Sequence, residues 1–119
     1  MALKKLVDRL TQPVEELDRR DLAAFCEALG VTPLDEVEPR RPVRVAGEVR
    51  SVRIVPRAGA DALEALVNDG RGSVTAVFLG RRKIGGVSPG RRVVLEGVPT
   101  SDGPRRVMYN PLYTLLPGR

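Results

Sequence analysis

The spacing of apolar residues changes from a helical period to a two-residue period near residue 43. Four apolar residues in the first ten recur at the spacing of one helical face: Leu3, Leu6, Val7 and Leu10. A similar spacing continues from residue 14 to residue 29, and Gly30 is a typical residue to end a helix. Thr11 and Pro13 interrupt the pattern between these two stretches. The sequence therefore predicts one bent helix or two short helices before residue 30.

Residues 31–42, "VTPLDEVEPRRP", hold three prolines and several acids, and we expect them to form a linker. Beyond this linker, stretches of alternating apolar and polar residues predict five strands. Their expected ranges are 43–55, 62–69, 73–80, 91–98 and 105–116. No helix of useful length lies between them, so the sheet is expected to be antiparallel and meander-like.

A sheet of this size buries one face only if it curls onto itself or is covered. Gly47, inside the long first strand, indicates a bend that lets this strand pair at two edges of a curved sheet. The pattern thus predicts a mainly β fold, a five-stranded OB-fold Greek-key barrel preceded by one or two short N-terminal helices. We expect the barrel to comprise residues 40–119, with the helical segment and linker of residues 1–39 packed on it.

The composition is that of a single domain of 119 residues with an aliphatic core, since the chain is 42% hydrophobic but has only two Phe, two Tyr and no Trp. Cys26 is the only cysteine and there is no histidine, which excludes an internal disulfide and the usual zinc sites. The lack of histidine also removes the commonest general base and activator of a nucleophile. We therefore expect neither a cofactor nor an enzymatic activity.

No apolar run approaches the roughly 18 to 20 residues needed to cross a bilayer. The start, "MALKKLVDRL", has charges among its apolar residues and lacks the continuous apolar segment of a signal peptide. A cytoplasmic protein without a membrane partner is the expectation.

The net charge of +5 is divided unevenly along the chain. Residues 1–39 carry five Lys and Arg against nine Asp and Glu, a net −4, whereas residues 40–119 carry fifteen against six, a net +9. Such a basic C-terminal part favours polyanions, because cationic side chains release counterions from phosphates. Nucleic acid, either DNA or RNA, is therefore the expected partner.

The glycine-rich stretch "NDGRGSVTAVFLG" (68–80) is typical of a hairpin rather than of a phosphate-binding loop. It lacks the G-x-x-x-x-G-K-[ST] pattern, and a β-type alternation follows the glycines where a dinucleotide fingerprint would open a helix. We predict that Asp69, Gly70 and Gly72 form a tight turn in which Asp69 hydrogen-bonds the turn backbone.

Several short motifs, in this order and spacing, resemble the OB-fold nucleic-acid-binding family. They are "VAGEV" (45–49), "NDGRG" (68–72), Pro89-Gly90 through Gly97, and Asn110-Pro111. The motifs resemble the subgroup of this family that includes the wedge domain of RecG-type helicases and the anticodon-binding domains of some tRNA synthetases. The segments "RLTQPVEELDRRDL" (9–22) and "LGRRKIGG" (79–86) also resemble small stand-alone OB-fold proteins of actinobacteria.

The resemblance implies a binding platform, and neither a helicase motor nor an aminoacylation module accompanies it. In an OB barrel the groove crosses strands two and three, between the loops that join strands one and two and strands four and five. Leu63, Glu64 and Ala65 stand where the synthetase domains have a stacking aromatic, which argues against sequence-specific base reading.

Nine cations are the candidates for phosphate contact, with guanidinium groups also able to stack on bases. They are Arg50, Arg53, Arg57, Arg71, Arg81, Arg82, Lys83, Arg105 and Arg106. Any one of them could instead belong to an ordinary solvated surface. Thr75 is expected in the groove if Val74, Ala76 and Phe78 face the core.

Two aromatic residues of the strand tract are candidates for base stacking. Phe78 fits either the barrel core or the binding face, and Tyr109 is expected to keep its hydroxyl near water. Cys26 fits the apolar helix face as a small core residue.

These residues support two functions. The first is a non-catalytic module that binds single-stranded or branched nucleic acid with low sequence specificity. The alternative, favoured by the scarcity of aromatics, is a protein-interaction module in a DNA repair or recombination assembly.

Overall fold

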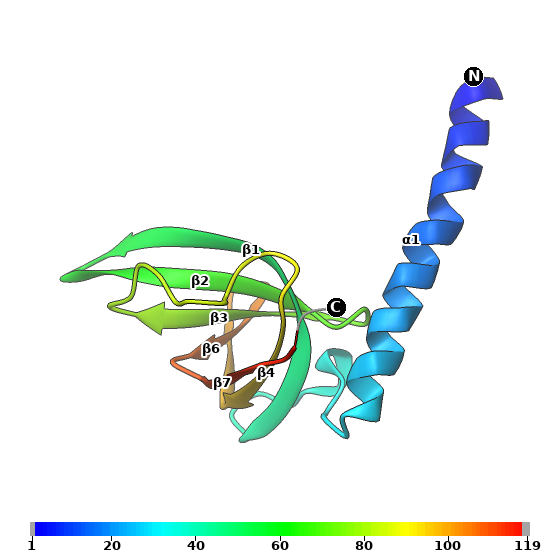
Figure 1. Cartoon of the computed structure of the whole chain (residues 1–119). Helices are drawn as coiled ribbons and strands as arrows, with labels where there is room; N and C mark the ends of the chain where they lie inside the picture. The colour runs from blue at the N-terminus through cyan, green and yellow to red at the C-terminus, as the bar shows by residue number, and fades with distance from the viewer. Residues whose placement is uncertain (1, 118–119) are drawn as a thin grey trace.

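This computed structural model describes the backbone of residues 2–117 and the side chains of residues 15–117. One helix, α1 (Ala2–Ala28), and a short 3-10 turn, η1 (Leu34–Glu36), precede a single curled sheet of seven strands (Figure 1). The strands are β1 (Val43–Arg57), β2 (Ala60–Asn68), β3 (Ser73–Leu79), β4 (Arg92–Gly97), β5 (Pro99–Asp102), β6 (Arg105–Tyr109) and β7 (Leu112–Leu115). Their order in the sheet is β5-β6-β3-β2-β1-β4-β7.

The sheet has seven strands where the sequence predicts five, because the last predicted strand is divided in two and the stretch before it forms a further strand. The predicted strand 105–116 breaks after Tyr109, since Asn110 has a positive φ of 49° and Pro111 has no N–H to donate to a ladder. Its second half, β7, then pairs with β4. Residues 99–102, part of which was expected to be a turn, form β5 and pair with β6.

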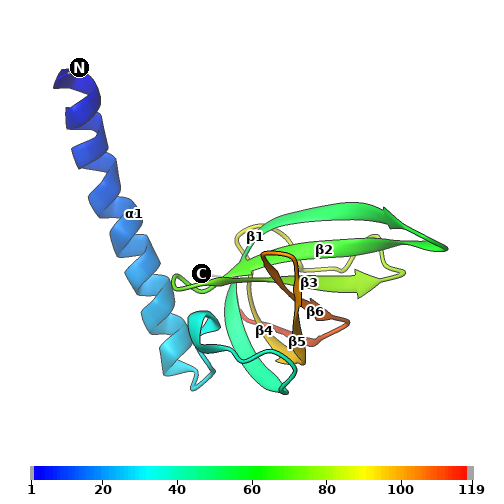
Figure 2. The same cartoon turned by 180° about the vertical axis from the view of Figure 1, so that it is seen from behind.

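The sequence predicts a meander-like, fully antiparallel sheet. This prediction is wrong for one pair of strands, because β6 runs parallel to β3. The chain leaves β3, passes through residues 80–91 to β4, and returns through the β5–β6 hairpin to the free edge of β3 (Figure 2). This return brings together strands that are distant in sequence. The alternation of apolar and polar residues within one strand does not indicate such a crossover.

The prediction that the long first strand, which contains Gly47, pairs at two edges of a curved sheet is confirmed. Residues 43–48 of β1 pair with β4, and residues 48–57 pair with β2, with a register shift between Val49 and Ser51. A side chain at Gly47 would place its Cβ 2.7 Å from the Asn68 carbonyl oxygen, so only glycine fits this close approach. One strand can therefore serve both halves of the curled sheet.

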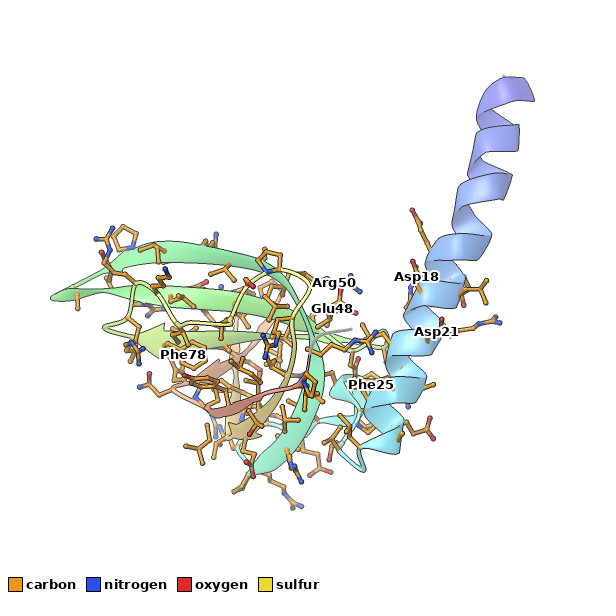
Figure 3. The ribbon with its side chains drawn as sticks, viewed as in Figure 1. Asp18, Asp21, Phe25, Glu48, Arg50 and Phe78 are labelled. Carbon is orange, nitrogen blue, oxygen red and sulfur yellow. The ribbon has the colours of Figure 1, made fainter. Side chains whose placement is uncertain are left out.

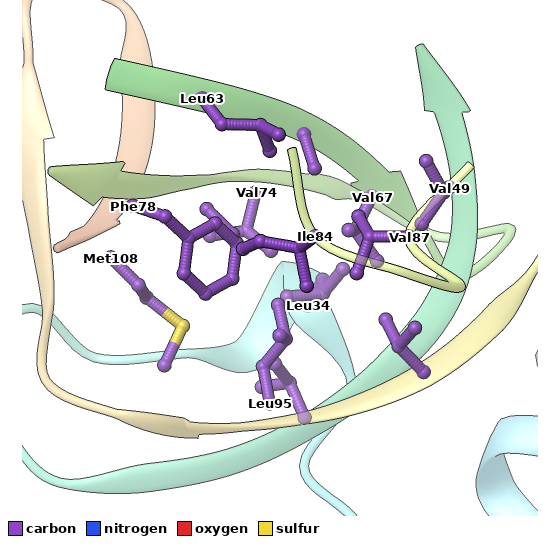
Figure 4. Close-up of a cluster of buried hydrophobic side chains, with 14 of the residues drawn as sticks. Leu34, Val49, Leu63, Val67, Val74, Phe78, Ile84, Val87, Leu95 and Met108 are labelled. Atoms are coloured by element: carbon purple, nitrogen blue, oxygen red, sulfur yellow. The ribbon is translucent and has the colours of Figure 1, made fainter. Parts of the chain in front are cut away.

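The core inside the curl is aliphatic, as the composition predicts. Leu63, Val74 and Leu95 are among its fully or almost fully buried side chains. Ile84 and Val87, from the irregular connection 80–91, also enter this cluster and close the end of the curled sheet (Figure 4). A connection without regular structure thus supplies part of the hydrophobic core.

Helix α1 continues through Pro13, so the break expected there is wrong. It ends as predicted just before Gly30, which has a φ of 72°. Leu22 and Cys26 near its C-terminal end pack against Ala46 and Val94, while the N-terminal half extends away from the sheet (Figure 1). The side chains of the predicted apolar face at residues 3–10 lie outside the described residues.

Cys26 is a buried residue of this contact, as predicted. Burial, followed by the charge of Asp69, raises the pKa of the Cys26 thiol to about 11. The thiol therefore stays protonated at neutral pH. Of the helices in residues 2–117, none is long and apolar enough to cross a bilayer.

Candidate nucleic-acid interface

The outward side of β1, β2, β3 and β6 forms one surface, which we call the front face. Alternation within β3 creates it: Val74, Ala76 and Phe78 belong to the core, so Thr75 lies on the opposite side. Thr75 therefore lines the groove, in the register that the sequence predicted for it. The front face comprises Ser51, Arg53, Arg57, Glu64, Leu66, Thr75, Arg105 and Tyr109.

Two hollows meet on the front face at Arg105. The first, of about 280 Å³, is lined by Ser51, Arg53, Glu64, Leu66, Thr75 and Arg105. The second, of about 340 Å³, lies beside the β5–β6 hairpin and is lined by Ser73, Ser101, Gly103, Pro104, Arg105 and Arg106. The two hollows share Arg105, and we call them together the groove.

Glu64 lies at the centre of the groove and gathers three of its arginines. Its carboxylate is only 4% exposed. Arg53 and Arg105 donate to its Oε1 at 3.1 and 3.0 Å, and the Arg57 guanidinium lies 3.5 Å from its Oε2. One carboxylate therefore fixes three cations from two strands, and the cluster keeps a net positive charge. Asp102 at the rim, 2.7 Å from Arg105, compensates part of that charge.

The ionisation of Glu64 is set by two opposed effects. Burial disfavours its charged form, but hydrogen bonds and charge from Arg105 and Arg53 outweigh burial, so the pKa of Glu64 lies below its usual range. The carboxylate is consequently charged at neutral pH and holds the arginines in place.

Replacing Glu64 with glutamine is expected to lower the free energy of unfolding by about 1 kcal/mol at neutral pH. Because the folded-state pKa is lowered, the ionised carboxylate stabilises the fold above its unfolded pKa, and this contribution disappears as the pH falls through the folded pKa. The difference between the two proteins in urea unfolding should therefore shrink between roughly pH 5 and pH 3. Glu96→Gln, at an exposed position of β4, is the control and should show little difference at either pH. A difference for Glu64→Gln that does not change with pH would contradict this account.

Tyr109 offers an accessible aromatic ring at one end of the front face. It is 42% exposed and pairs with Val77 in the β3–β6 ladder. The Arg57 guanidinium lies 5.7 Å from the centre of its ring, within the range of a cation–π contact. Leu66, also on this face, is partly exposed. The groove thus combines cations with apolar surface.

Phe78 is 6% exposed and packs edge-on against Tyr113. Of the two positions that the sequence left open, the ring takes the core position (Figure 4). A base cannot stack on it without opening the core, so we remove Phe78 from the candidate site.

Arg71 projects from the β2–β3 hairpin toward the linker instead of toward the groove. Its guanidinium lies 3.1 Å from Asp35 and 2.9 Å from Glu36, both in η1. The acidic N-terminal part therefore neutralises this predicted contact residue.

Arg50 lies on the α1 side of β1, away from the groove (Figure 3). It donates to Glu48 at 3.1 Å and lines a hollow of about 140 Å³ between helix and sheet, together with Asp18 and Asp21. Arg92, in the same hollow, stacks over Phe25 at 4.4 Å. The contact between Arg92 and Phe25 therefore joins β4 to α1.

The remaining predicted cations are divided between two other places. Arg106 donates to the Ser73 carbonyl at 3.2 Å and lines the second hollow, next to the front face. Arg81, Arg82 and Lys83 are exposed in the connection after β3, where Arg82 donates to Asp61 at 2.7 Å. That connection begins beside the β1–β2 hairpin, because the Gly80 N–H donates to the Asp61 carbonyl.

The β2–β3 turn has the structure predicted for it. Asp69 Oδ1 accepts hydrogen bonds from the Arg71 and Gly72 N–H groups, each at 2.8 Å. The sequence did not predict that Asp69 Oδ2 also accepts from the buried Leu34 N–H at 2.8 Å. This bond ties the turn to η1 across 35 residues of sequence.

Glu64 and Leu66 are residues of the groove that were not predicted from the sequence. A signal for Glu64 was present: the predicted hairpin between the first two strands sets it opposite Arg53, as observed. Among the described residues, no group of three or more His, Cys, Asp or Glu side chains is placed to hold a metal ion.

Comparison with known proteins finds similarity in structure. A solved structure of RecG bound to a three-way DNA junction superposes with a TM-score of 0.57 at 18% sequence identity. The match covers 70% of this chain and 12% of the RecG chain, so this chain spans a small part of that protein. No protein-family model matches the sequence, and no curated protein matches it either. At this identity the likeness concerns the fold.

Proposed function

We propose that this protein is a non-catalytic OB-fold module that binds single-stranded or branched nucleic acid with low sequence specificity. The observation that carries the proposal is the groove on the front face, where three arginines, an exposed tyrosine and an exposed leucine lie together. Phosphates would contact Arg53, Arg57 and Arg105, and a base would stack on Tyr109.

Strand topology supports the OB assignment. An OB barrel has five strands in a Greek key, with its third and fifth strands parallel. Here β4 with β5 corresponds to the fourth strand and β6 with β7 to the fifth, while β3 and β6 pair in parallel. The groove occupies the position at which OB-folds bind oligonucleotides, across strands two and three. The RecG structure that is similar to this chain was solved with a three-way DNA junction.

The proposal is tested by fluorescence anisotropy of labelled single-stranded DNA, single-stranded RNA, duplex DNA and a three-way junction over a salt series. Binding should weaken linearly with the logarithm of the salt concentration, and single strands or the junction should bind more tightly than the duplex. Absence of binding to all four at low salt would overturn the proposal.

Replacing Tyr109 with alanine is expected to weaken binding of single strands about fivefold to tenfold, in line with roughly 1 kcal/mol for one stacked base. Tyr109→Phe, which keeps the aromatic face, should bind nearly as well as the unchanged protein. The dependence on salt should be the same for all three proteins, because stacking involves no phosphate. Equal losses for both substitutions would instead indicate a role of the hydroxyl group.

A protein-interaction module is the second candidate, and Glu64 is the observation that favours it. A carboxylate in the middle of a groove repels phosphates, and it already satisfies Arg53 and Arg105. Exposed Leu66 and Leu79 would suit a protein surface. Lack of nucleic-acid binding, together with a protein partner that is lost on Leu66→Glu, would favour this function.

A further inference from the structure

Helix α1 carries an apolar stripe that differs from the face it packs on the sheet. The stripe comprises Leu3, Leu6, Val7, Leu10, Val14 and Leu17. At 3.6 residues per turn, its centre lies about 100° around the helix from the centre of Leu22, Phe25 and Cys26, which pack on the sheet. The stripe is therefore not a continuation of the packed face.

The structure leaves the described end of this stripe uncovered. Leu17 is 56% exposed, the second-highest exposure among the described large hydrophobic side chains. The N-terminal half of α1, where the other stripe positions lie, extends away from the sheet in both views (Figures 1 and 2). Leu17 is thus an exposed apolar side chain at the described end of a helix face that is apolar in sequence, and such a face calls for a partner.

The charge along α1 points to a second copy of the same helix in antiparallel orientation. Residues 1–14 carry three Lys and Arg against one Asp, a net +2, whereas residues 15–28 carry two against five, a net −3. An antiparallel pair sets each basic half beside the acidic half of the other copy, and a parallel pair would set like charges together.

Apart from Val7, which comes level with Pro13, the stripe is also symmetric about Leu10, as a two-fold antiparallel pair requires. With Leu10 of both copies level, Leu3 comes level with Leu17 of the second copy, and Leu6 with Val14. Lys4 then lies on the same flank as Glu15 and Asp18 of the second copy, within about one helical turn. Both the apolar spacing and the charges thus fit a single register.

We propose that this protein self-associates through α1, as an antiparallel two-helix contact centred on Leu10. The contact extends about 21 Å from Leu3 to Leu17. With a width of about 10 Å, it covers roughly 200 Å² per copy, well below a standard interface, so only a weak dimer, near the upper end of the micromolar range, is expected. This dimer involves no residue of the front face and is independent of nucleic-acid binding.

Sedimentation equilibrium of the full chain over micromolar concentrations tests the proposal. The mass should rise with concentration from 13.0 kDa toward twice that value. Leu10→Glu should weaken association at least tenfold, because it sets two carboxylates at the two-fold axis. Gln12→Glu adds the same charge on the opposite side of the helix and should leave association unchanged. Circular dichroism melts of both variants establish that the sheet remains folded.

Orientation is tested by disulfide cross-linking. A chain with Leu3→Cys should cross-link to a chain with Leu17→Cys and not to itself, with the unchanged protein, whose Cys26 is buried, as background. Self-linking of the Leu3→Cys chain would overturn the antiparallel register. A protein that stays monomeric at all concentrations would overturn the proposal. If that monomer also binds vesicles containing anionic lipid and loses this binding on Leu10→Glu, the apolar stripe contacts membranes instead of a second copy.

Discussion

Replacing both Arg57 and Arg105 with glutamine is expected to weaken the binding of single-stranded nucleic acid about 60-fold at about 50 mM salt and about tenfold at 200 mM. The reason is counterion release: each phosphate neutralised on a single strand contributes about 0.7 to the slope of log K against log salt. Losing two contacts therefore reduces that slope by about 1.4. Anisotropy titrations over the salt series measure both quantities.

The matched control removes two positive charges elsewhere. Arg41 and Arg44 are exposed and lie outside the groove. Arg41 precedes β1, and Arg44 lies on the half of β1 that pairs with β4. Replacing both with glutamine changes the net charge by the same amount, yet it should leave the slope nearly unchanged. If the two double variants lose affinity equally, binding depends on overall charge and the front face is not the site.

Replacing Asp69 with alanine is expected to lower the free energy of unfolding by about 3 kcal/mol. The carboxylate is 2% exposed and accepts three backbone hydrogen bonds, one of them from the buried Leu34 N–H. Without it, the Leu34 N–H is buried with no acceptor, and the turn loses the bonds that hold Gly70 in its left-handed conformation. Urea unfolding followed by circular dichroism measures the loss.

Asp61→Ala is the control for this change. Asp61 stands at the other end of the same hairpin, and its carboxylate accepts from the exposed Arg82 side chain. Its replacement should cost well under 1 kcal/mol, since exposed ion pairs contribute little. An equally small loss at Asp69 would mean that the turn is held by its glycines and by contacts with α1 alone.

Prediction from the sequence was most successful where the determining interactions are local. The β2–β3 turn depends on Asp69 and two glycines within four residues, and its structure is the predicted one. Thr75 was placed on the groove side by alternation with Val74 and Ala76, which depends on strand geometry alone. The close approach of Gly47 to the Asn68 carbonyl oxygen depends on the absence of a side chain at a single position.

Prediction failed where the outcome depends on partners distant in sequence. Phe78 fits either face of an isolated strand, and only the packing of Tyr113 and the core residues against it decides between them. Arg71 is indistinguishable in sequence from Arg57, but η1 sets two acids beside it.

The sequence by itself determined a mainly β protein with an N-terminal helix, an aliphatic core, a tight β2–β3 turn and a basic C-terminal part. These features depend on composition, on the period of apolar residues and on turn residues close together in the chain. All of these can be obtained from the sequence without knowing which distant residues meet. The tertiary structure decided the parallel β3–β6 pairing, the division of the last predicted strand, and which arginines share a groove. Those features are contacts between residues that lie up to about 40 positions apart, as for Arg105 and Glu64, and such contacts form only when the sheet curls.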